Sequence, residues 1–182
     1  MAIDKVVSAS ITTDAVGPTQ LNEASNYAFT GTVTGAGESN IPYFRARISG
    51  EPSFTPSATT KVQFNAEVFD SANAYDHTTN YRFTAPSAGK YKFNTFMNLR
   101  NDNGLKDLRV HYYLNGSQIT NGMYNIMRSN NNPFQSCSMP LTVILNLSVS
   151  DYIEVYVYST TSSGNFTIDG FGMFEGFKLT AS

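Results

Sequence analysis

The chain has 182 residues and a formal net charge of −2; only 14% of its residues are charged, while 13% are aromatic. This length fits one domain with a sizeable core, and the low charge predicts a surface rich in Asn, Ser, Thr and Gly. A weakly acidic chain without a run of Lys or Arg has no basic field to attract phosphate groups, which excludes nucleic acid as an expected partner.

Cys137 is the single cysteine, so an intrachain disulfide is excluded and a zinc cluster is not expected. We predict that its side chain is a small buried hydrophobe. The N-terminus lacks the apolar core of a signal peptide, and no apolar run of about 18 residues occurs in the chain. We therefore expect synthesis in the cytoplasm and no membrane insertion.

Residues 1–40 differ from the rest of the chain because they are rich in Ala, Thr, Ser and Gly and end in the run GTVTGAGESN. We interpret 1–40 as an N-terminal anchoring segment and linker, with a short helical turn expected at 20–25. From Ile41 onward the dominant hydrophobic period is two, which is typical of strands with one buried face. Residues 41–182 are therefore predicted to form the head domain.

The stretch AYDHTTNYRFTAPSAGKYKF, residues 74–93, places an aspartate, a histidine and two threonines before a turn at 86–89. Hydrolytic catalysis would need a nucleophile, a nearby base and a group that orients the base. Asp and Thr in such a segment more often bond their own backbone and shape a turn. We predict a structural role for Asp76, His77 and the threonines, packing of Tyr75 and Phe83, and no enzymatic activity.

Alternation of apolar residues predicts the central strands. In YKFNTFMNLR, residues 91–100, Phe96 is the exception on the polar face, and the inward face carries Tyr91, Phe93, Met97 and Leu99. In LRVHYYLNGSQI, residues 108–119, the inward face carries Leu108, Val110, Tyr112 and Leu114. Asn115-Gly116 is the strongest short signal for a two-residue hairpin, so another antiparallel strand is expected directly after it.

The segment LTVILNLSVSDYIEVYVYST, residues 141–160, predicts two strands divided by Ser150-Asp151. The inward face of the first carries Leu141, Val143, Leu145, Leu147 and Val149. In the second, three tyrosines lie on the nominally outer face, which is too many for a plain solvated surface. We therefore predict that this face meets another sheet or another subunit. The candidate residues for a subunit contact are His111 and Tyr113 from the preceding strand and Tyr152, Tyr156 and Tyr158 from this one.

FGMFEGFKLT, residues 171–180, predicts a terminal strand whose glycines allow close backbone approach. No helical pattern is found after residue 41. Short strands with frequent turn signals predict an all-β fold, an antiparallel two-sheet sandwich of the jelly-roll type.

The segment RNDNGLKD, residues 100–107, is the first candidate loop for ligand contact. It offers Asn101, Asp102, Asn103 and Asp107, whose oxygens suit calcium. It lacks the further acidic spacing and terminal Glu of an EF-hand loop. A polar turn between strands is therefore favoured over a calcium site, and no cofactor is expected.

The segment NIMRSNNNPFQS, residues 125–136, is the second candidate loop. Its candidate ligand-contact residues are Arg128, Asn130, Asn131 and Phe134. Amide groups can hydrogen-bond to a sugar while a neighbouring aromatic ring stacks on it. Loops on a rigid sandwich commonly carry binding groups. An ordinary solvent loop or a contact within an oligomer is the alternative.

Six ordered segments carry a resemblance to a known family: YFRARISG, VQFNAEVFD, AYDHTTNYRFTAPSAGKYKF, VHYYLNG, DYIEVYVYS and FEGFKL. Over residues 41–180 the chain resembles the globular-head domain of complement component one, subcomponent q, a branch of the tumour-necrosis-factor-like jelly rolls. The resemblance implies about ten short strands in two sheets, a homotrimer with its termini together at one end, and binding rather than catalysis.

Residues 11–37 are similar to the Thr/Gly-rich segments of fibre and surface proteins of tailed bacteriophages. We therefore expect a non-enzymatic, trimeric decoration or short-fibre protein on the surface of a phage particle, held to other virion proteins through residues 1–40. Two alternatives stay open. One is a receptor-binding tail-fibre tip that recognises a host-surface glycan or protein, and the other is a non-viral, secreted-type, lectin-like binding module.

Overall fold

The computed structural model describes residues 41–120, 124–129 and 132–180, and the regular structure in these ranges is all β-strand. The predicted all-β fold is therefore confirmed. The anchoring segment expected at 1–40, with its helical turn at 20–25, lies outside the described residues. Among the described residues there is no helix long and apolar enough to cross a membrane.

Thirteen strands run through the described ranges: β1 Tyr43–Arg47, β2 Ser53–Phe54, β3 Thr60–Lys61, β4 Ala66–Asp70, β5 Tyr75–Asp76, β6 Arg82–Thr84, β7 Gly89–Leu114, β8 Ser117–Gln118, β9 Tyr124–Arg128, β10 Phe134–Leu147, β11 Tyr152–Thr161, β12 Phe166–Ile168 and β13 Met173–Thr180. Four of them, β2, β3, β5 and β8, are two residues long. These short pieces explain why the count exceeds the about ten strands expected.

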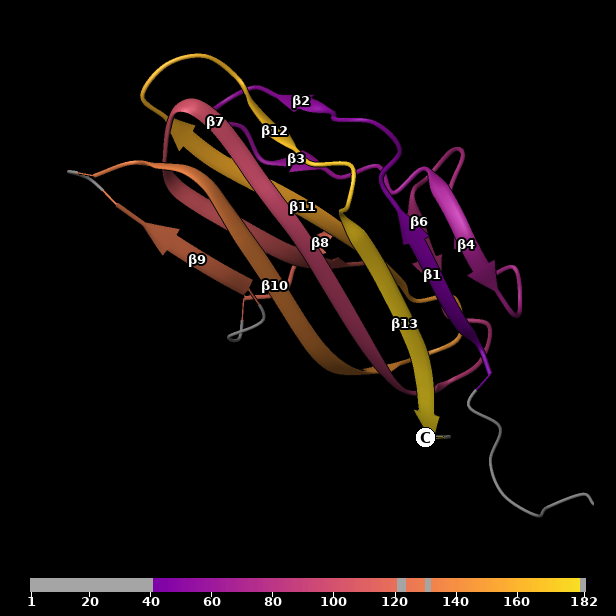
Figure 1. Cartoon of the computed structure of the whole chain (residues 1–182). Helices are drawn as coiled ribbons and strands as arrows, with labels where there is room; N and C mark the ends of the chain where they lie inside the picture. The colour runs from indigo at the N-terminus through magenta and orange to yellow at the C-terminus, as the bar shows by residue number, and fades with distance from the viewer. Residues whose placement is uncertain (1–40, 121–123, 130–131, 181–182) are drawn as a thin grey trace, which may run out of the picture. The chain divides into compact units, whose positions relative to one another are not determined.

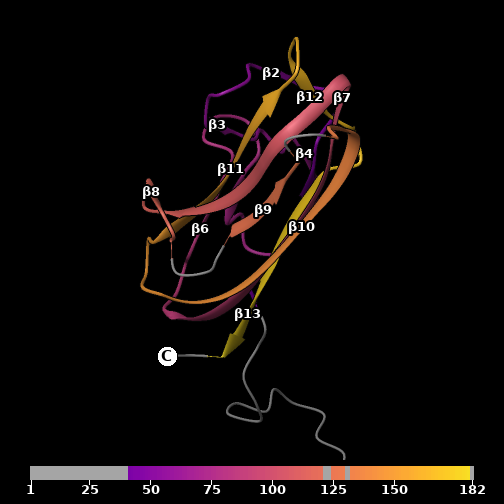
Figure 2. The ribbon, with the colours of Figure 1, turned by 90° about the vertical axis from the view of Figure 1, so that its left-hand side faces the viewer.

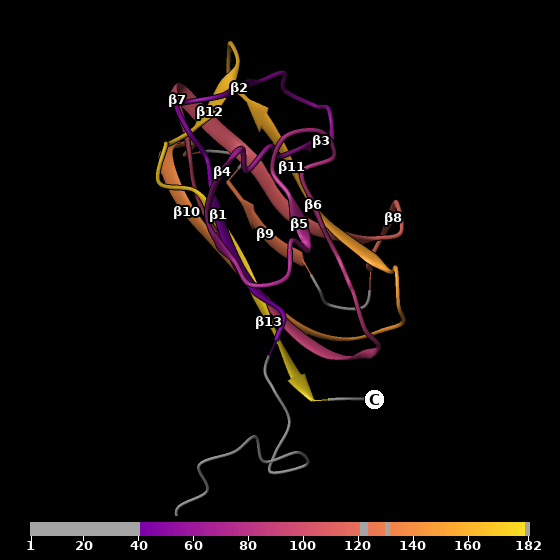
Figure 3. The same cartoon turned by 90° about the vertical axis from the view of Figure 1, so that its right-hand side faces the viewer.

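Strand β7 belongs to both layers of the sandwich. Up to Arg100 it pairs antiparallel with β13 and β10, and from Leu105 onward it pairs with β11 and β9. The front sheet therefore has the order β4–β1–β13–β7–β10, and the back sheet has the order β5–β6–β11–β7–β9. Figure 2 and Figure 3 show β10 and β13 in one layer and β11 and β6 in the other.

Residues 100–107 form a corner within β7 rather than the predicted turn between two strands. Gly104 allows the corner because it adopts a φ of +101°, and a Cβ at this position would overlap the side chain of Pro133. The prediction of a long loop at 125–136 also needs correction. Its two ends are strands β9 and β10, because both hydrogen-bond to β7.

The core between the layers is aromatic. Phe44 stacks on Tyr75 and Phe83, with ring centroids 4.9 and 5.1 Å apart, and Phe174 meets Phe44 edge-on at 5.0 Å. Gly176 lies against Phe93, where a Cβ would come within 2.5 Å of the ring, so the close approach predicted for the terminal strand is confirmed. Aromatic pairs of this kind add stability beyond the area that they bury.

The predicted inward faces are confirmed with one exception. The residues assigned to the inward face of 91–100 are buried, Phe96 is half-buried on the opposite face, and those of 108–114 are buried apart from the half-buried Leu114. Val149, however, is 59% exposed because β10 ends before it, at Leu147. Cys137 is only half-buried, which corrects the prediction of a buried hydrophobe.

The described chain begins and ends at the same end of the sandwich, where the N–H of Lys178 donates to the carbonyl of Pro42 at 2.9 Å. The corner of β7 lies at the opposite end, together with β2 and β12 (Figure 1). We call this opposite end the tip. At the start end, Asn115 and Gly116 adopt φ values of +51° and +76°, which confirms the two-residue hairpin between β7 and β8.

Candidate functional site

The Asp76 cluster is a turn held by hydrogen bonds. The Asp76 carboxylate accepts bonds from the backbone N–H groups of Thr79 and Thr78 at 2.9 and 3.0 Å, and from the backbone and side chain of Asn80 at 3.0 and 2.7 Å. The Thr79 bond, together with the others, holds the pKa of Asp76 well below its usual value. His77 Nδ1 lies 3.2 Å from Glu67 Oε2. The predicted structural role of Asp76 and the threonines is confirmed.

The two candidate loops meet at the tip. Asn101 is buried, and its amide donates to the carbonyls of Ser163 and Asn165 at 3.0 and 2.7 Å, so it positions the neighbouring turn. Asp102 and Asn103 beside it are exposed. Pro133 packs on Gly104, and Gln135 Nε2 donates to the Asp102 carbonyl at 3.4 Å.

The remaining residues of the second loop do not form one site. Arg128 Nε lies 3.4 Å from Asp107 Oδ2, at the end of β9. Phe134 is half-buried, pairs with Leu105 and packs against the core. Asn130 and Asn131 lie outside the described residues.

A polar pocket of about 270 Å³ opens at the tip. Its lining residues come from three parts of the chain: Glu51, Arg100, Asn101, Asp102, Asn165 and Thr167. The sequence predicted Asn101 and Asp102 as candidates but missed the other four. Their convergence depends on the pairing of β12 with β2 and β7, which no local sequence pattern predicts.

The five residues predicted to form a subunit contact share the outward face of the back sheet, which we call the tyrosine face. The rings of Tyr113 and Tyr156 stack with centroids 3.9 Å apart. Arginines from the same chain cover the other two tyrosines, with Arg82 4.2 Å above the Tyr152 ring and Arg109 4.7 Å above the Tyr158 ring. Much of this face is therefore already occupied by the chain's own side chains.

His111 is the buried member of the tyrosine face. Its Nδ1 is 2.9 Å from the Gln118 amide nitrogen, and burial lowers the pKa of its imidazole. Nearby, Glu154 is buried and accepts a hydrogen bond from Lys61 Nζ at 2.6 Å. These contacts support the back sheet internally.

The outward side of the front sheet, which we call the front face, has a polar row across four strands. Arg45 Nε donates to Glu175 at 2.7 Å, Asn94 donates to the same carboxylate at 3.2 Å, and Thr142 donates to Asn94 at 2.8 Å. The flanking positions are largely apolar: Tyr43, Phe177 and Ile144, together with Lys92, on one side, and Met173, Phe96 and Pro140, together with Arg47, on the other.

The front face also exposes large apolar side chains. Tyr43 is 46% exposed and Ile144 is 56% exposed. A shallow pocket of about 370 Å³ lies between β4, β1 and β13, where the Arg45 guanidinium sits 5.6 Å from the Phe69 ring. Exposed apolar side chains that lie close together mark surfaces that bind another protein. The sequence analysis did not identify this face.

Within the described ranges, His, Cys, Asp and Glu side chains form no group of three or more that could hold a metal ion. Three sulfur atoms lie close together, with Cys137 Sγ 3.1 Å from Met127 Sδ and 3.9 Å from Met139 Sδ. Burial raises the pKa of the Cys137 thiol, which disfavours the thiolate that would bind a metal.

The architecture defines a tumour-necrosis-factor-like jelly roll. Murine APRIL superposes with a TM-score of 0.53 and 12% identity, over 76% of this chain and 98% of that one, which confirms the predicted fold. The globular domain of zebrafish complement 1qA protein matches with a TM-score of 0.49 and 17% identity, over 78% of this chain and 99% of that one. No protein-family model matches the sequence.

The sequence is similar to that of a curated protein of a phage-like element. The phage-like element PBSX protein XkdV of Bacillus subtilis (strain 168) is 26% identical over 113 residues, which is 60% of this chain. The matched part is 16% of the length of XkdV, so the chain corresponds to a small part of that protein. The similarity agrees with the phage context predicted from residues 11–37.

Proposed function

We propose that the chain is a non-enzymatic, homotrimeric head on the surface of a bacteriophage particle, acting as a capsid decoration or short fibre. The observation that carries the proposal is the front face, where apolar side chains surround a paired polar row. The homotrimer implied by the family resemblance supplies the occupant of this face, namely a second copy of the chain. The similarity to XkdV supports the phage context.

The front face and the tyrosine face are the two candidate surfaces for the trimer contact, and we favour the front face. Tyr43 and Ile144 on the front face are exposed, whereas the rings of the tyrosine face are stacked on one another or covered by Arg82 and Arg109. The tyrosine face, with His111, Tyr113, Tyr152, Tyr156 and Tyr158, is the second candidate contact. Residues 1–40 are proposed to bind other virion proteins.

A matched pair of substitutions tests the front face. Ile144→Arg places a charge among the apolar residues of that face, so we expect sedimentation at the 20.0 kDa mass of one chain instead of three times that mass. Val149→Arg makes the same chemical change at a residue of similar exposure on a turn, and we expect it to leave the trimer intact.

The same measurement separates the alternatives. Trimers in Ile144→Arg together with monomers in Tyr156→Ser would move the contact to the tyrosine face. A wild-type chain that sediments as a monomer at micromolar concentration would contradict the trimer altogether. The position on the particle is tested by finding the chain in an electron-microscopy map of the intact virion, at a capsid lattice axis or on the tail.

The second candidate function is a receptor-binding tip that recognises a host-surface glycan or protein. The observation that favours it is the polar pocket at the tip, because the tip lies opposite the end where the described chain begins. A head anchored through its N-terminal side would present this pocket outward. Binding of the purified chain to host cells, and loss of that binding in pocket variants, is the direct test.

A further inference from the structure

The tip pocket joins three segments that are far apart in sequence. Glu51 follows β1, Arg100 and Asp102 belong to the corner of β7, and Asn165 and Thr167 lie at the start of β12. Carboxylate, guanidinium, amide and hydroxyl groups therefore line one cavity. Convergent polar groups of this kind fix the orientation of a small ligand.

Hydrogen bonds between its segments hold the pocket in shape. The Asn101 amide nitrogen donates to the carbonyls of Ser163 and Asn165, which ties the loop before β12 to the corner of β7. Its side-chain oxygen accepts the backbone N–H of Asn103 at 2.8 Å. Asn165 Nδ2 in turn donates to Ser53 Oγ at 3.2 Å. A site that is already ordered loses little conformational entropy when a ligand binds.

The charge around the pocket is negative. Glu51 and Asp102 contribute carboxylates, and Arg100 is the cation among the lining residues. Arg100 Nη1 lies 3.6 Å from Asp169 Oδ1, a buried oxygen that receives no hydrogen bond from any described residue. At that distance the guanidinium is close enough to offset the Asp169 charge but too far to form a hydrogen bond with Oδ1. The pocket therefore disfavours anions and favours hydroxyl or ammonium donors.

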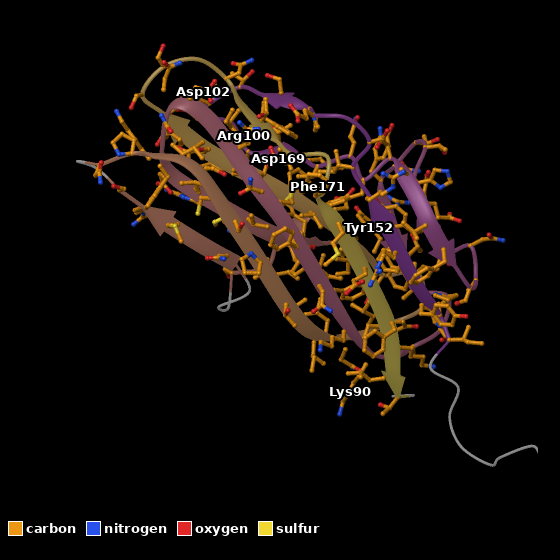
Figure 4. The ribbon with its side chains drawn as sticks, viewed as in Figure 1. Lys90, Arg100, Asp102, Tyr152, Asp169 and Phe171 are labelled. Atoms are coloured by element: carbon orange, nitrogen blue, oxygen red, sulfur yellow. The ribbon has the colours of Figure 1, made fainter. Side chains whose placement is uncertain are left out.

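Phe171 lies outside the lining of this pocket, in a turn that contacts the segment carrying Glu51. It is 83% exposed, in the turn between β12 and β13. The turn is fixed because Ile48 N donates to Gly172 O at 2.9 Å, and because Gly170 packs on the carbonyl of Gly50, the residue before Glu51. Figure 4 shows Asp102, Arg100, Asp169 and Phe171 one after another from the tip towards the start of β13.

We propose that the tip pocket and Phe171 together bind a saccharide unit that carries no negative charge. The C–H face of the sugar ring stacks on Phe171, its hydroxyl groups donate to the carboxylates of Glu51 and Asp102, and Arg100 donates to a ring or hydroxyl oxygen. An amino group on the sugar strengthens binding through the same carboxylates. This inference rests on the receptor-binding candidate function and names its ligand class and residues.

Titration of the full chain with three monosaccharides, followed by ligand-observed NMR, tests the site. We expect glucosamine to bind in the millimolar range, glucose more weakly, and glucuronate at least tenfold more weakly than glucosamine. Phe171→Ala removes the stacking surface and Glu51→Gln removes one charge, so each is expected to weaken glucosamine binding about tenfold. Val149→Ala, an exposed apolar residue outside the tip, is the matched control and is expected to bind normally.

Three results would overturn the proposal: glucuronate binding as tightly as glucosamine, unchanged binding in both Phe171→Ala and Glu51→Gln, or loss of binding in EDTA, because recognition would then require an ion. Absence of binding to all three sugars would also overturn it. Sedimentation of the same samples keeps the two proposals apart. An intact trimer that binds no sugar would contradict only the proposed saccharide site. A monomer that binds glucosamine would contradict only the proposed trimer.

Discussion

Single residues show why residue type alone does not identify a site in this chain. Asp76 and His77 are groups that catalysis uses, yet the Asp76 carboxylate accepts four hydrogen bonds from Thr78, Thr79 and Asn80. This outcome was predictable because the bonds are local and the sequence contains both partners. Phe171 was missed, although an aromatic between two glycines in a turn was a visible signal. Glu51 and Arg100 carried no local signal, because their neighbourhood forms only after distant strands pair.

The bonds to Asp76 predict an acid-dependent contribution to stability. Asp76→Asn keeps one acceptor oxygen but loses the charge and one oxygen, so we expect a loss of about 1–2 kcal/mol in the free energy of unfolding near neutral pH. The folded-state pKa is lowered, so the contribution is complete above the unfolded pKa of about 4 and is lost as the pH falls below it. Urea unfolding at neutral and acid pH measures both effects.

Asp102→Asn is the control for this experiment, because the Asp102 side chain is exposed and the structure describes no hydrogen bond to its carboxylate. We expect the control to leave the free energy of unfolding nearly unchanged at each pH. A difference between wild type and Asp76→Asn that stays constant from neutral to acid pH would contradict the linkage.

At the scale of elements, alternation predicted which side chains face inward but not where strands begin and end. The inward faces of 91–100 and 108–114 were predictable because a period of two is a property of the strand alone. The corner of β7 was taken for a turn because Asn, Asp and Gly are turn residues. The ends of the loop at 125–136 became strands because β7 offers a hydrogen-bonding edge on each layer, which only the assembled sheets provide.

The corner of β7 depends on Gly104. In Gly104→Ala the new Cβ strains a φ of +101° and overlaps Pro133, so we expect a loss of about 2–3 kcal/mol in the free energy of unfolding. Gly50→Ala is the matched control, because Gly50 also has a positive φ, +84°, but has open space at the Cβ position. For Gly50→Ala we expect a loss of about 1 kcal/mol in the free energy of unfolding. Equal losses in the two variants, measured by urea midpoints, would show that contact with Pro133 does not shape the corner.

For the whole molecule, the family resemblance predicted the sandwich but not the surfaces that it creates. The polar row Arg45–Glu175–Asn94–Thr142 combines residues from four strands that are separated by up to 130 positions. Each residue is ordinary in its own segment. Only the register of β1, β13, β7 and β10 aligns them, and with them the apolar rows on either side. The front face was therefore beyond the reach of a local pattern.

A trimer with three tip pockets predicts avidity that a single chain lacks. Three identical weak sites on one rigid body raise the effective concentration of the second and third contacts, so we expect a surface densely coated with glucosamine to hold the wild-type trimer about 10²–10⁴ times more tightly than free glucosamine is held. Ile144→Arg separates the chains without touching the pocket, so it should keep the affinity for free glucosamine and lose the gain on the surface. Surface plasmon resonance at several coating densities measures both quantities.

Phe171→Ala is the complementary variant: it should remain trimeric and lose binding both to free glucosamine and to the coated surface. If Ile144→Arg sediments as a monomer yet keeps the full gain on the dense surface, multivalent contact is not how the head binds.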